Sequence, residues 1–291
     1  MRESIQIRGL PDGRLHLHEG PIDLIVEAFG APQEVGRAYD AAVAAFPAVL
    51  PDLVAELPQL RRPLGADLPA LRGAVAQRML DAAAPHRPAF VTPMAAVAGA
   101  VADHLLAAMT EAAELSRAYV NDGGDIALHL APGESLACGL VAELAAPRLD
   151  GRAVITADMP LRGIATSGRA HLDQGGRSFS LGIADAVTVF ARDAAAADVA
   201  ATLIANAVDL PGHPAIQRQP AEVLDPESDL AGREVTVAVG TLRQEEIRAA
   251  LQRGCNVVER MRAEGLIEAA ALFLRGEAEV VAAPAGLLAA A

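Results

Sequence analysis

The chain has 291 residues, of which 52% are hydrophobic and 21% are charged, so it can bury a large core and is not disordered throughout. Its formal net charge is −13, which argues against a nucleic-acid-binding protein because such proteins present a basic face. Aromatic residues make up only 3% and Trp is absent, so few side chains can stack on the rings of a ligand.

Apolar periodicity along the chain predicts strands and helices in mixed order. Alternating segments and short apolar runs predict strands over residues 5–8, 14–18, 21–28, 119–130, 136–144, 152–157, 186–191 and 234–240. The first two form a predicted hairpin around residues 11–13, and residues 272–282 are predicted to be a closing strand or a hairpin around Gly276. Apolar residues three and four apart predict helices over residues 33–46, 70–84, 94–113, 194–208 and 244–264. Because strands and helices mix without strict alternation, we predict an α+β fold, a single layered domain of mixed or antiparallel sheets with packed helices over residues 1–291.

Three further segments carry no clear period. We predict an irregular connector with short helical turns over the proline-rich residues 47–69, and a polar surface excursion over residues 212–233. The last residues, 284–291, are expected to be a frayed tail. His16 and His18 lie two apart on one strand face, and we interpret them as surface histidines because the sequence offers no further metal ligands.

The cysteines and the N-terminus bear on the cellular compartment. Cys138 and Cys255 match no zinc-finger spacing and no disulfide framework, so we interpret them as buried thiols in a reducing compartment. Residues 1–6 show no apolar signal segment and no lipoprotein cysteine. The longest apolar runs, such as residues 94–102, are too short to span a bilayer. We therefore predict a soluble cytoplasmic protein without a membrane partner.

The sequence Asn121-Asp122-Gly123-Gly124-Asp125 places two glycines where the chain turns between two strands. Glycine lets backbone amides face a ligand, and the flanking polar side chains can fix the loop or bind ligand hydroxyls. The alternative is a hairpin turn with Asn and Asp as turn formers, and the motif alone favours that alternative. A phosphate loop of the Gly-x-x-x-x-Gly-Lys type is excluded because the lysine is missing.

Two hydroxyls and a glycine, Thr166-Ser167-Gly168, follow an apolar approach at a strand end. They suit contacts with phosphate or carbonyl groups, while structural capping is the alternative that the motif alone favours. No Gly-x-Ser-x-Gly elbow surrounds Ser167, so the sequence does not predict a serine nucleophile.

Asp198 and Thr202 are four residues apart in a predicted helix, which places them on one face with Cβ atoms about 5–6 Å apart. Both side chains offer hard oxygen atoms, which suit Mg²⁺ when water and phosphate complete its ligands. The alternative is that Asp198 complements the dipole at the start of its own helix.

The helix predicted over residues 94–113 begins with many small residues, and Asp103 ends this small-residue stretch. Small residues let a backbone approach a ligand or another element closely. Ligand binding and tight helix–sheet packing remain equal alternatives.

These motifs, taken together and in this order, resemble the ApbE-like family, whose characterised members are FAD:protein FMN transferases. That family has an Asn-x-Gly-Gly-Asp turn, an Ala-Thr-Ser-Gly segment and an Ala-Asp-x-x-x-Thr helix, which correspond here to residues 121–125, 165–168 and 197–202. The helix from Met94 to Asp103 is similar to the family's glycine-rich flavin-phosphate helix. The resemblance implies an ApbE-like fold and Mg²⁺ held by Asp198 and Thr202. It also implies a pocket for FAD or another flavin, lined by Asn121, Gly123, Gly124, Asp125, Thr166, Ser167 and Gly168.

The chain departs from the family pattern in two places. Ala98 stands where the family has a lysine in its glycine-rich helix. Residues 178–185 lack the family's His-x-x-Asp-Pro-x-Thr-Gly segment, for which Asp185 and His171 are the nearby substitutes. The lipoprotein signal of many family members is also absent, so the resemblance implies a cytoplasmic branch of the family without an assigned catalytic residue.

Three functional hypotheses follow. The first is an enzyme that binds a flavin or related phosphorylated cofactor with Mg²⁺, with FMN transfer from FAD as its reaction. The second is a non-catalytic flavin or cofactor carrier, and the third is a cofactor-biosynthesis enzyme acting on another ligand, such as a pterin of one-carbon metabolism. The expected partner is a small phosphorylated molecule. The amphipathic helix over residues 244–264 makes a homo-oligomer a further expectation.

Overall fold

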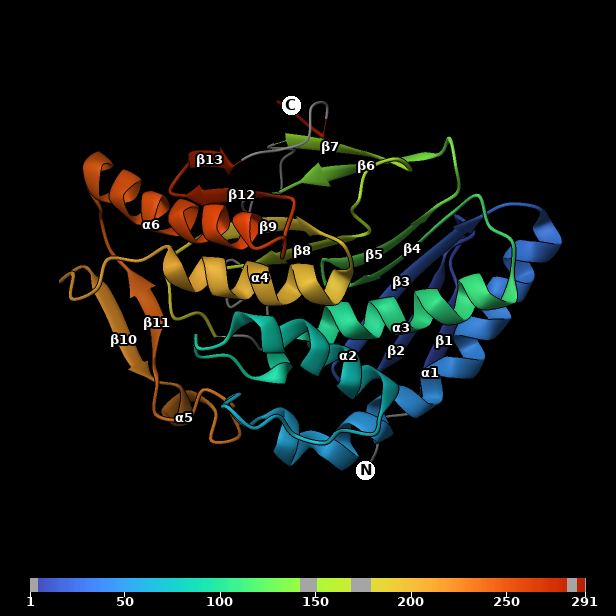
Figure 1. Ribbon diagram of the computed structural model, residues 1–291, viewed down its shortest axis with the longest axis horizontal. Helices are drawn as coiled ribbons and strands as arrows, with labels where there is room; N and C mark the ends of the chain where they lie inside the picture. The colour runs from blue at the N-terminus through green and yellow to red at the C-terminus, as the bar shows by residue number, and fades with distance from the viewer. Residues whose placement is uncertain (1–4, 142–150, 169–178, 282–286, 291) are drawn as a thin grey trace. The chain divides into compact units, whose positions relative to one another are not determined.

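The computed structural model describes residues 5–141, 151–168, 179–281 and 287–290, and it has the predicted α+β fold (Figure 1). It divides into two compact units. Unit 1 comprises residues 1–136, 155–165 and 191–199, and unit 2 comprises residues 137–154, 166–190 and 200–291. Each unit is described by itself.

Unit 1 contains an antiparallel run of strands in the order β1-β2-β3-β4-β5-β8. The bounds are β1 Gln6–Gly9, β2 Leu15–Glu19, β3 Ile22–Phe29, β4 Arg117–Asp122, β5 Asp125–Leu130 and β8 Gly163–Ser167. Alternate residues of the central strands are buried, so one face of this run forms part of the core. The hairpins predicted around residues 11–13 and 123–124 are confirmed.

The helices of unit 1 pack on that strand run and on one another. They are α1 Pro32–Leu60, α2 Ala74–Ala83, the short η1 Ala84–His86 and η2 Pro93–Ala96, α3 Val97–Ala112 and the first turns of α4 Ala194–Ala207. The apolar helix α3 lies against β4 and β5 and also packs against α1 and α2 (Figure 1). The N-terminal end of α3 contributes to the candidate site described below.

The prediction of an irregular connector after residue 46 is wrong, because α1 continues through Pro47, Pro51 and Pro58. Its buried residues keep helical spacing along the whole length: Ala38, Ala42, Phe46, Val49, Leu53 and Leu60. Pro47 and Pro58 are exposed, so the prolines remove backbone hydrogen bonds without entering the core. Packing of the apolar face outweighs the local preference of proline for ending a helix.

Two helical stretches, Pro32–Leu60 and Pro93–Ala112, are long and apolar enough to cross a membrane by length and composition alone. Both have buried faces in unit 1, which gives their apolar residues a role in the protein core. The buried share of the apolar window is 22% in Pro32–Leu60 and 44% in Pro93–Ala112, so the expectation that every apolar run is too short to span a bilayer is not met.

Unit 2 is built around the antiparallel strands β9 Ala186–Ala191, β12 Ala269–Leu274 and β13 Glu277–Val281. Helix α6 Gln244–Ala263 packs on β12 and β13. Smaller pairings complete the unit: β10 Ile216–Pro220, followed by α5 Ala221–Leu224, pairs with β11 Glu234–Val239, and β14 Leu288–Ala290 pairs with β7 Gly151–Thr156, which neighbours β6 Ser135–Leu140.

Two further expectations are corrected by unit 2. Part of the segment expected to be a polar excursion forms β10 and α5, and residues 288–290 of the expected frayed tail form β14. In both cases the hydrogen-bonding partner is distant in sequence, so a local pattern could not reveal it.

The continuous helix α1 leads to a stability prediction. Replacing the fully buried Phe46 with Ala should lower the free energy of unfolding by about 3–5 kcal/mol, because a large side chain leaves the core. The neighbouring Pro47→Ala should not lower stability, because Pro47 is exposed and Ala favours a helix interior. Urea unfolding of both variants tests this, and an equal loss in Pro47→Ala would contradict the helical assignment.

Candidate functional site

In unit 1 the N-terminal ends of α3 and α4 exchange hydrogen bonds with each other's aspartates. The backbone N–H of Gly99 in α3 donates to Asp198 Oδ2 of α4 over 3.1 Å. In return, the N–H groups of Ala194 and Ala195 in α4 donate to Asp103 Oδ1 and Oδ2 of α3 over 3.1 and 2.9 Å. The first N–H groups of a helix lack partners within the helix and attract negative charge. Each helix therefore supplies the carboxylate that satisfies the other.

Gly99 permits this exchange because the two backbones lie very close together. A Cβ atom at Gly99 would be 2.3 Å from the carbonyl oxygen of Ala194, far inside any normal contact. At this position the small-residue stretch serves tight packing, but against a helix end instead of a sheet. Asp193 caps α4 in the ordinary way, because its Oδ1 accepts from Ala196 N–H over 2.7 Å. Asp198 accordingly satisfies α3, and not its own helix.

A third carboxylate, Asp122, lies close enough to Asp198 for their charges to interact. Asp122 ends β4 with only 8% of its surface exposed, and its Oδ1 receives a long 3.4 Å hydrogen bond from Asp23 N–H. Burial raises the pKa of Asp122 to about 7 and that of Asp103 to about 6. Burial, followed by the negative charges of Asp122 and Asp103, raises the pKa of Asp198, while the amides of α3 oppose that rise. A state in which all three carboxylates are ionised is therefore unfavourable unless a cation lies beside them.

The turn between β4 and β5 is open to its surroundings. Gly123 and Gly124 have φ values of 63° and 112°, and a Cβ atom on either would meet nothing within 4 Å. The positive φ values, and not crowding by neighbouring atoms, therefore explain why glycine occupies these two positions. Asn121 Oδ1 accepts from Gly124 N–H over 2.8 Å, which is the turn-forming role that the sequence allowed as an alternative.

Some of the predicted site residues lie in unit 2, where other groups of the protein already contact them. Thr166 Oγ1 lies 2.9 Å from Thr188 Oγ1 in a hydrogen bond, and a Cβ atom at Gly168 would be 2.5 Å from the Asp185 carbonyl oxygen. Ser167 ends β8 and is partly buried, as is Thr202 on α4. These positions show a packing reason for Gly168 and a hydrogen-bond partner for Thr166 within the protein.

Asp185 and His171 are the residues that the sequence offers in place of the missing family segment. The Asp185 carboxylate accepts a hydrogen bond from Arg275 N–H at the turn between β12 and β13, so it anchors a hairpin. His171 and Ser178 lie outside the described residues.

The sequence motifs did not identify Asp122 and Asp103 as partners of Asp198. For Asp122 a signal existed, because the alternation along β4 places it on the same buried face as Ala118 and Val120. For Asp103 no local signal existed, because its partners are the amides of residues 194–195, more than 90 positions away.

The donor set suits a hard cation such as Mg²⁺. Such an ion takes one or two carboxylates and completes its ligands with water and phosphate oxygens. Among the described residues, no three or more His, Cys, Asp or Glu side chains are arranged to form a full metal site. Asp198 and Thr202 both lie on α4, four positions apart, as the sequence predicts.

The close approach at Gly99 predicts a sharp difference between two glycines. Gly99→Ala should lower the free energy of unfolding by about 1–3 kcal/mol or prevent folding, because the new Cβ meets a backbone oxygen. Gly36→Ala, in α1, should be neutral or stabilising by about 0.5–1 kcal/mol, because nothing lies within 4 Å of its added Cβ. Thermal and urea unfolding compare the two variants, and equal stability of both would refute the close crossing of α3 and α4.

The raised pKa of Asp122 predicts how stability depends on pH. The folded chain holds this proton more tightly than the unfolded chain, so the contribution of Asp122 is full below about pH 4 and is lost as pH rises through about 7. The free energy of unfolding should therefore fall between pH 5 and 8. Asp122→Asn, which cannot ionise, should show a shallower fall in urea unfolding at several pH values. Parallel curves for both proteins would contradict this assignment.

Comparison with known proteins identifies the family of this chain. Residues 7–280 match the family model described as AbpE bacteria. The chain is 34% identical to a UPF0280 protein of Archaeoglobus fulgidus over 160 residues, which is 54% of this chain and 60% of the relative. It is also 40% identical to a UPF0280 protein of Methanothrix thermoacetophila over 118 residues, or 40% of this chain and 46% of the relative. The chain thus spans about half the length of the curated relatives it matches.

Among solved structures, the apo form of the Pseudomonas stutzeri flavinyl transferase ApbE aligns with 97% of this chain and 96% of that chain, with 12% identity and a TM-score of 0.39. The family model, in contrast, covers nearly the whole sequence, and the matched range includes the motifs at residues 121–125, 165–168 and 197–202. The chain belongs to the ApbE-like family described as AbpE bacteria.

Proposed function

We propose that this protein binds a flavin or a related phosphorylated cofactor together with Mg²⁺, and that transfer of FMN from FAD is its reaction. Membership of the ApbE-like family and the order of the three motifs support this class of ligand. The observation that carries the proposal is Asp198, an aspartate whose pKa is raised beside two further carboxylates.

The electrostatics of unit 1 favour a cation at Asp198. Burial and the charges of Asp122 and Asp103 disfavour the ionised form, and a divalent cation would reverse that preference. Asp198 and Thr202 would hold the ion, with water and ligand phosphate as its remaining ligands. When bound, the ion supplies stabilisation of the charge that develops on a pyrophosphate as its bond breaks.

The chain's own groups would orient the ligand and the carboxylate. The Gly99 N–H donates to one oxygen of Asp198, which limits the directions from which a cation can approach this carboxylate. Gly123 and Gly124 lie in an open turn, where their backbone can come close to a ligand, and Asp125 would contact ligand hydroxyls. Ser167 would contribute a hydroxyl contact. The family resemblance supports these roles. We also propose a cytoplasmic location without a nucleic-acid or membrane partner, and the net charge of −13 supports the absence of a nucleic-acid partner.

A second candidate, a non-catalytic flavin carrier, is favoured by two observations. Ala98 replaces the family's lysine, and the carboxylate of Asp185 is already engaged by the backbone of Arg275. A carrier on this fold would bind FAD without cleaving its pyrophosphate.

Metal-dependent FAD binding tests the proposal. Asp198→Asn keeps an oxygen that can accept from Gly99 N–H but loses the charge, so Mg²⁺-dependent quenching of FAD fluorescence should weaken at least about tenfold. Asp198→Ala should abolish it. The exposed Asp40→Asn in α1 serves as the matched control and should bind like the wild type. Unchanged affinity in folded Asp198→Asn would remove the metal assignment.

Product analysis separates transferase from carrier. Incubation with FAD, Mg²⁺ and threonine- or serine-containing acceptor peptides should release AMP and yield a flavinylated peptide, as chromatography and mass spectrometry would show. Tight binding with intact FAD after prolonged incubation would instead establish the carrier.

A further inference from the structure

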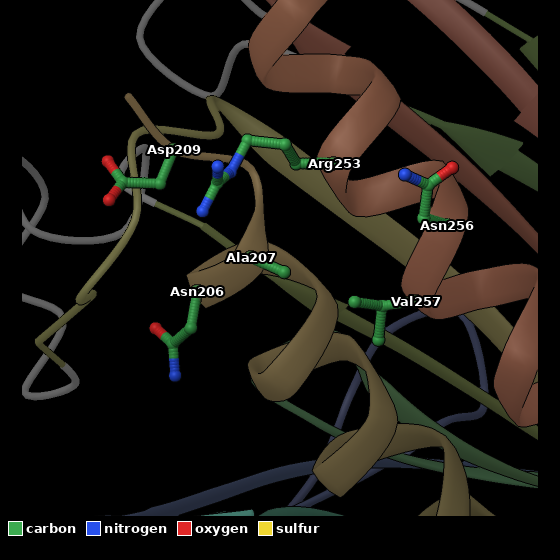
Figure 2. A pocket seen from close by; sticks show the side chains of 6 residues that line it. All are labelled: Asn206, Ala207, Asp209, Arg253, Asn256 and Val257. Carbon is green, nitrogen blue, oxygen red and sulfur yellow. The ribbon is translucent and has the colours of Figure 1, made fainter. Parts of the chain in front are cut away.

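Unit 2 contains a hollow of about 330 Å³ between the C-terminal end of α4 and the middle of α6 (Figure 2). Its lining residues come from these two elements and the segment that follows α4: Asn206, Ala207, Asp209, Arg253, Asn256 and Val257. Most of this lining is polar, although the chain as a whole is rich in Ala, Val and Leu. No residue of the hollow belongs to the flavin and Mg²⁺ assignment.

The α4 side of the hollow is held by a hydrogen-bond network. Arg218 forms an ion pair with Asp209 and also donates to the carbonyl oxygen of Leu181. The N–H of Leu181 in turn donates to Asn206 Oδ1 over 2.9 Å. The charge of Asp209 is therefore already balanced, and the amide oxygen of Asn206 is already used.

The α6 side is fixed by close packing at Gly254. A Cβ atom there would lie 2.5 Å from Val208 Cγ2 and 2.6 Å from Leu272 Cδ2, so α6 lies directly against the end of α4 and against β12. The neighbouring Arg253 is thereby placed at the edge of the hollow. The walls of the hollow are thus formed before any ligand arrives.

Three side chains of the hollow keep hydrogen-bond donors available. Asn256 Oδ1 accepts from Gln252 Nε2 over 3.0 Å, which leaves the Asn256 NH₂ group, as the Leu181 contact leaves the NH₂ group of Asn206. Within the described parts of the chain Arg253 forms no ion pair and no side-chain hydrogen bond. Figure 2 shows its guanidinium extending from α6 toward the side of Asn206 and Asp209. Two amide NH₂ groups and a guanidinium can donate to an anion, and the ion pair with Arg218 offsets the charge of the Asp209 carboxylate beside them.

We propose that this hollow binds a small metabolite through a phosphate or carboxylate group, with Arg253 as its charged anchor. The planar guanidinium presents paired donors that match either oxyanion. A volume of about 330 Å³ lies at the lower end of the range for ligand pockets, so the ligand is small. Ala207 and Val257 provide apolar contacts for its carbon skeleton. The net charge of −13 repels anions at long range, so recognition depends on these local donors.

Inorganic phosphate and acetate, titrated separately at constant ionic strength, test the proposal in the full chain. The side-chain NH₂ signals of Asn206 and Asn256 should shift in ¹H–¹⁵N NMR spectra with saturable dependence on at least one anion, and the stronger of the two identifies the oxyanion class. Arg253→Gln should weaken that binding at least tenfold. Arg260→Gln, another exposed arginine of α6 outside the hollow, should leave it unchanged.

A second variant keeps the test independent of charge at position 253. Asn256→Asp preserves the side-chain shape but replaces donors with acceptors, and it should also weaken binding at least tenfold. Equal losses in Arg253→Gln and Arg260→Gln would overturn the proposal, because they would indicate a general charge effect. So would the absence of saturable shifts with both anions, or wild-type affinity in Arg253→Gln. Asp198→Asn should bind the anion normally, which separates this site from the proposed cofactor function.

Discussion

The contact between Gly99 and the first residues of α4 holds the functional part of unit 1 together. Only a residue without a side chain lets the two helix ends come so close, because any Cβ would overlap the carbonyl of Ala194. The close crossing brings the unsatisfied amides of each helix to an aspartate of the other. Asp103 and Asp198 are consequently held by hydrogen bonds before any ligand is present.

This arrangement concentrates negative charge where water is scarce. Asp122 adds a third carboxylate from the end of β4, and burial raises the pKa values of all three aspartates. Buried like charges reduce the stability of a fold, and such strained electrostatics occur most often where a protein binds or transforms a ligand. The proposed Mg²⁺ would offset this charge, because the ion prefers oxygen ligands.

Unit 2 presents the opposite chemistry at the hollow beside Arg253. There one side-chain oxygen each of Asp209, Asn206 and Asn256 accepts a hydrogen bond within the protein, and the amide and guanidinium donors remain available. The two sites therefore differ in the charge they would attract: a cation at Asp198 and an anion at Arg253. Both depend on a glycine, Gly99 or Gly254, that lets a helix approach its neighbour without a side chain between them.

The sequence by itself determined the α+β class, most strands and helices, and the ordered motifs that place the chain in its family, because these depend on local periodicity and short patterns. Tertiary structure decided the remainder. Phe46, Val49 and Leu53 gain enough from burial to extend α1 through its prolines, which local propensity opposes. The grouping of Asp198 with Asp103 and Asp122 depends on segments about 75 to 95 positions apart, and no local pattern encodes which helix end a distant carboxylate will meet.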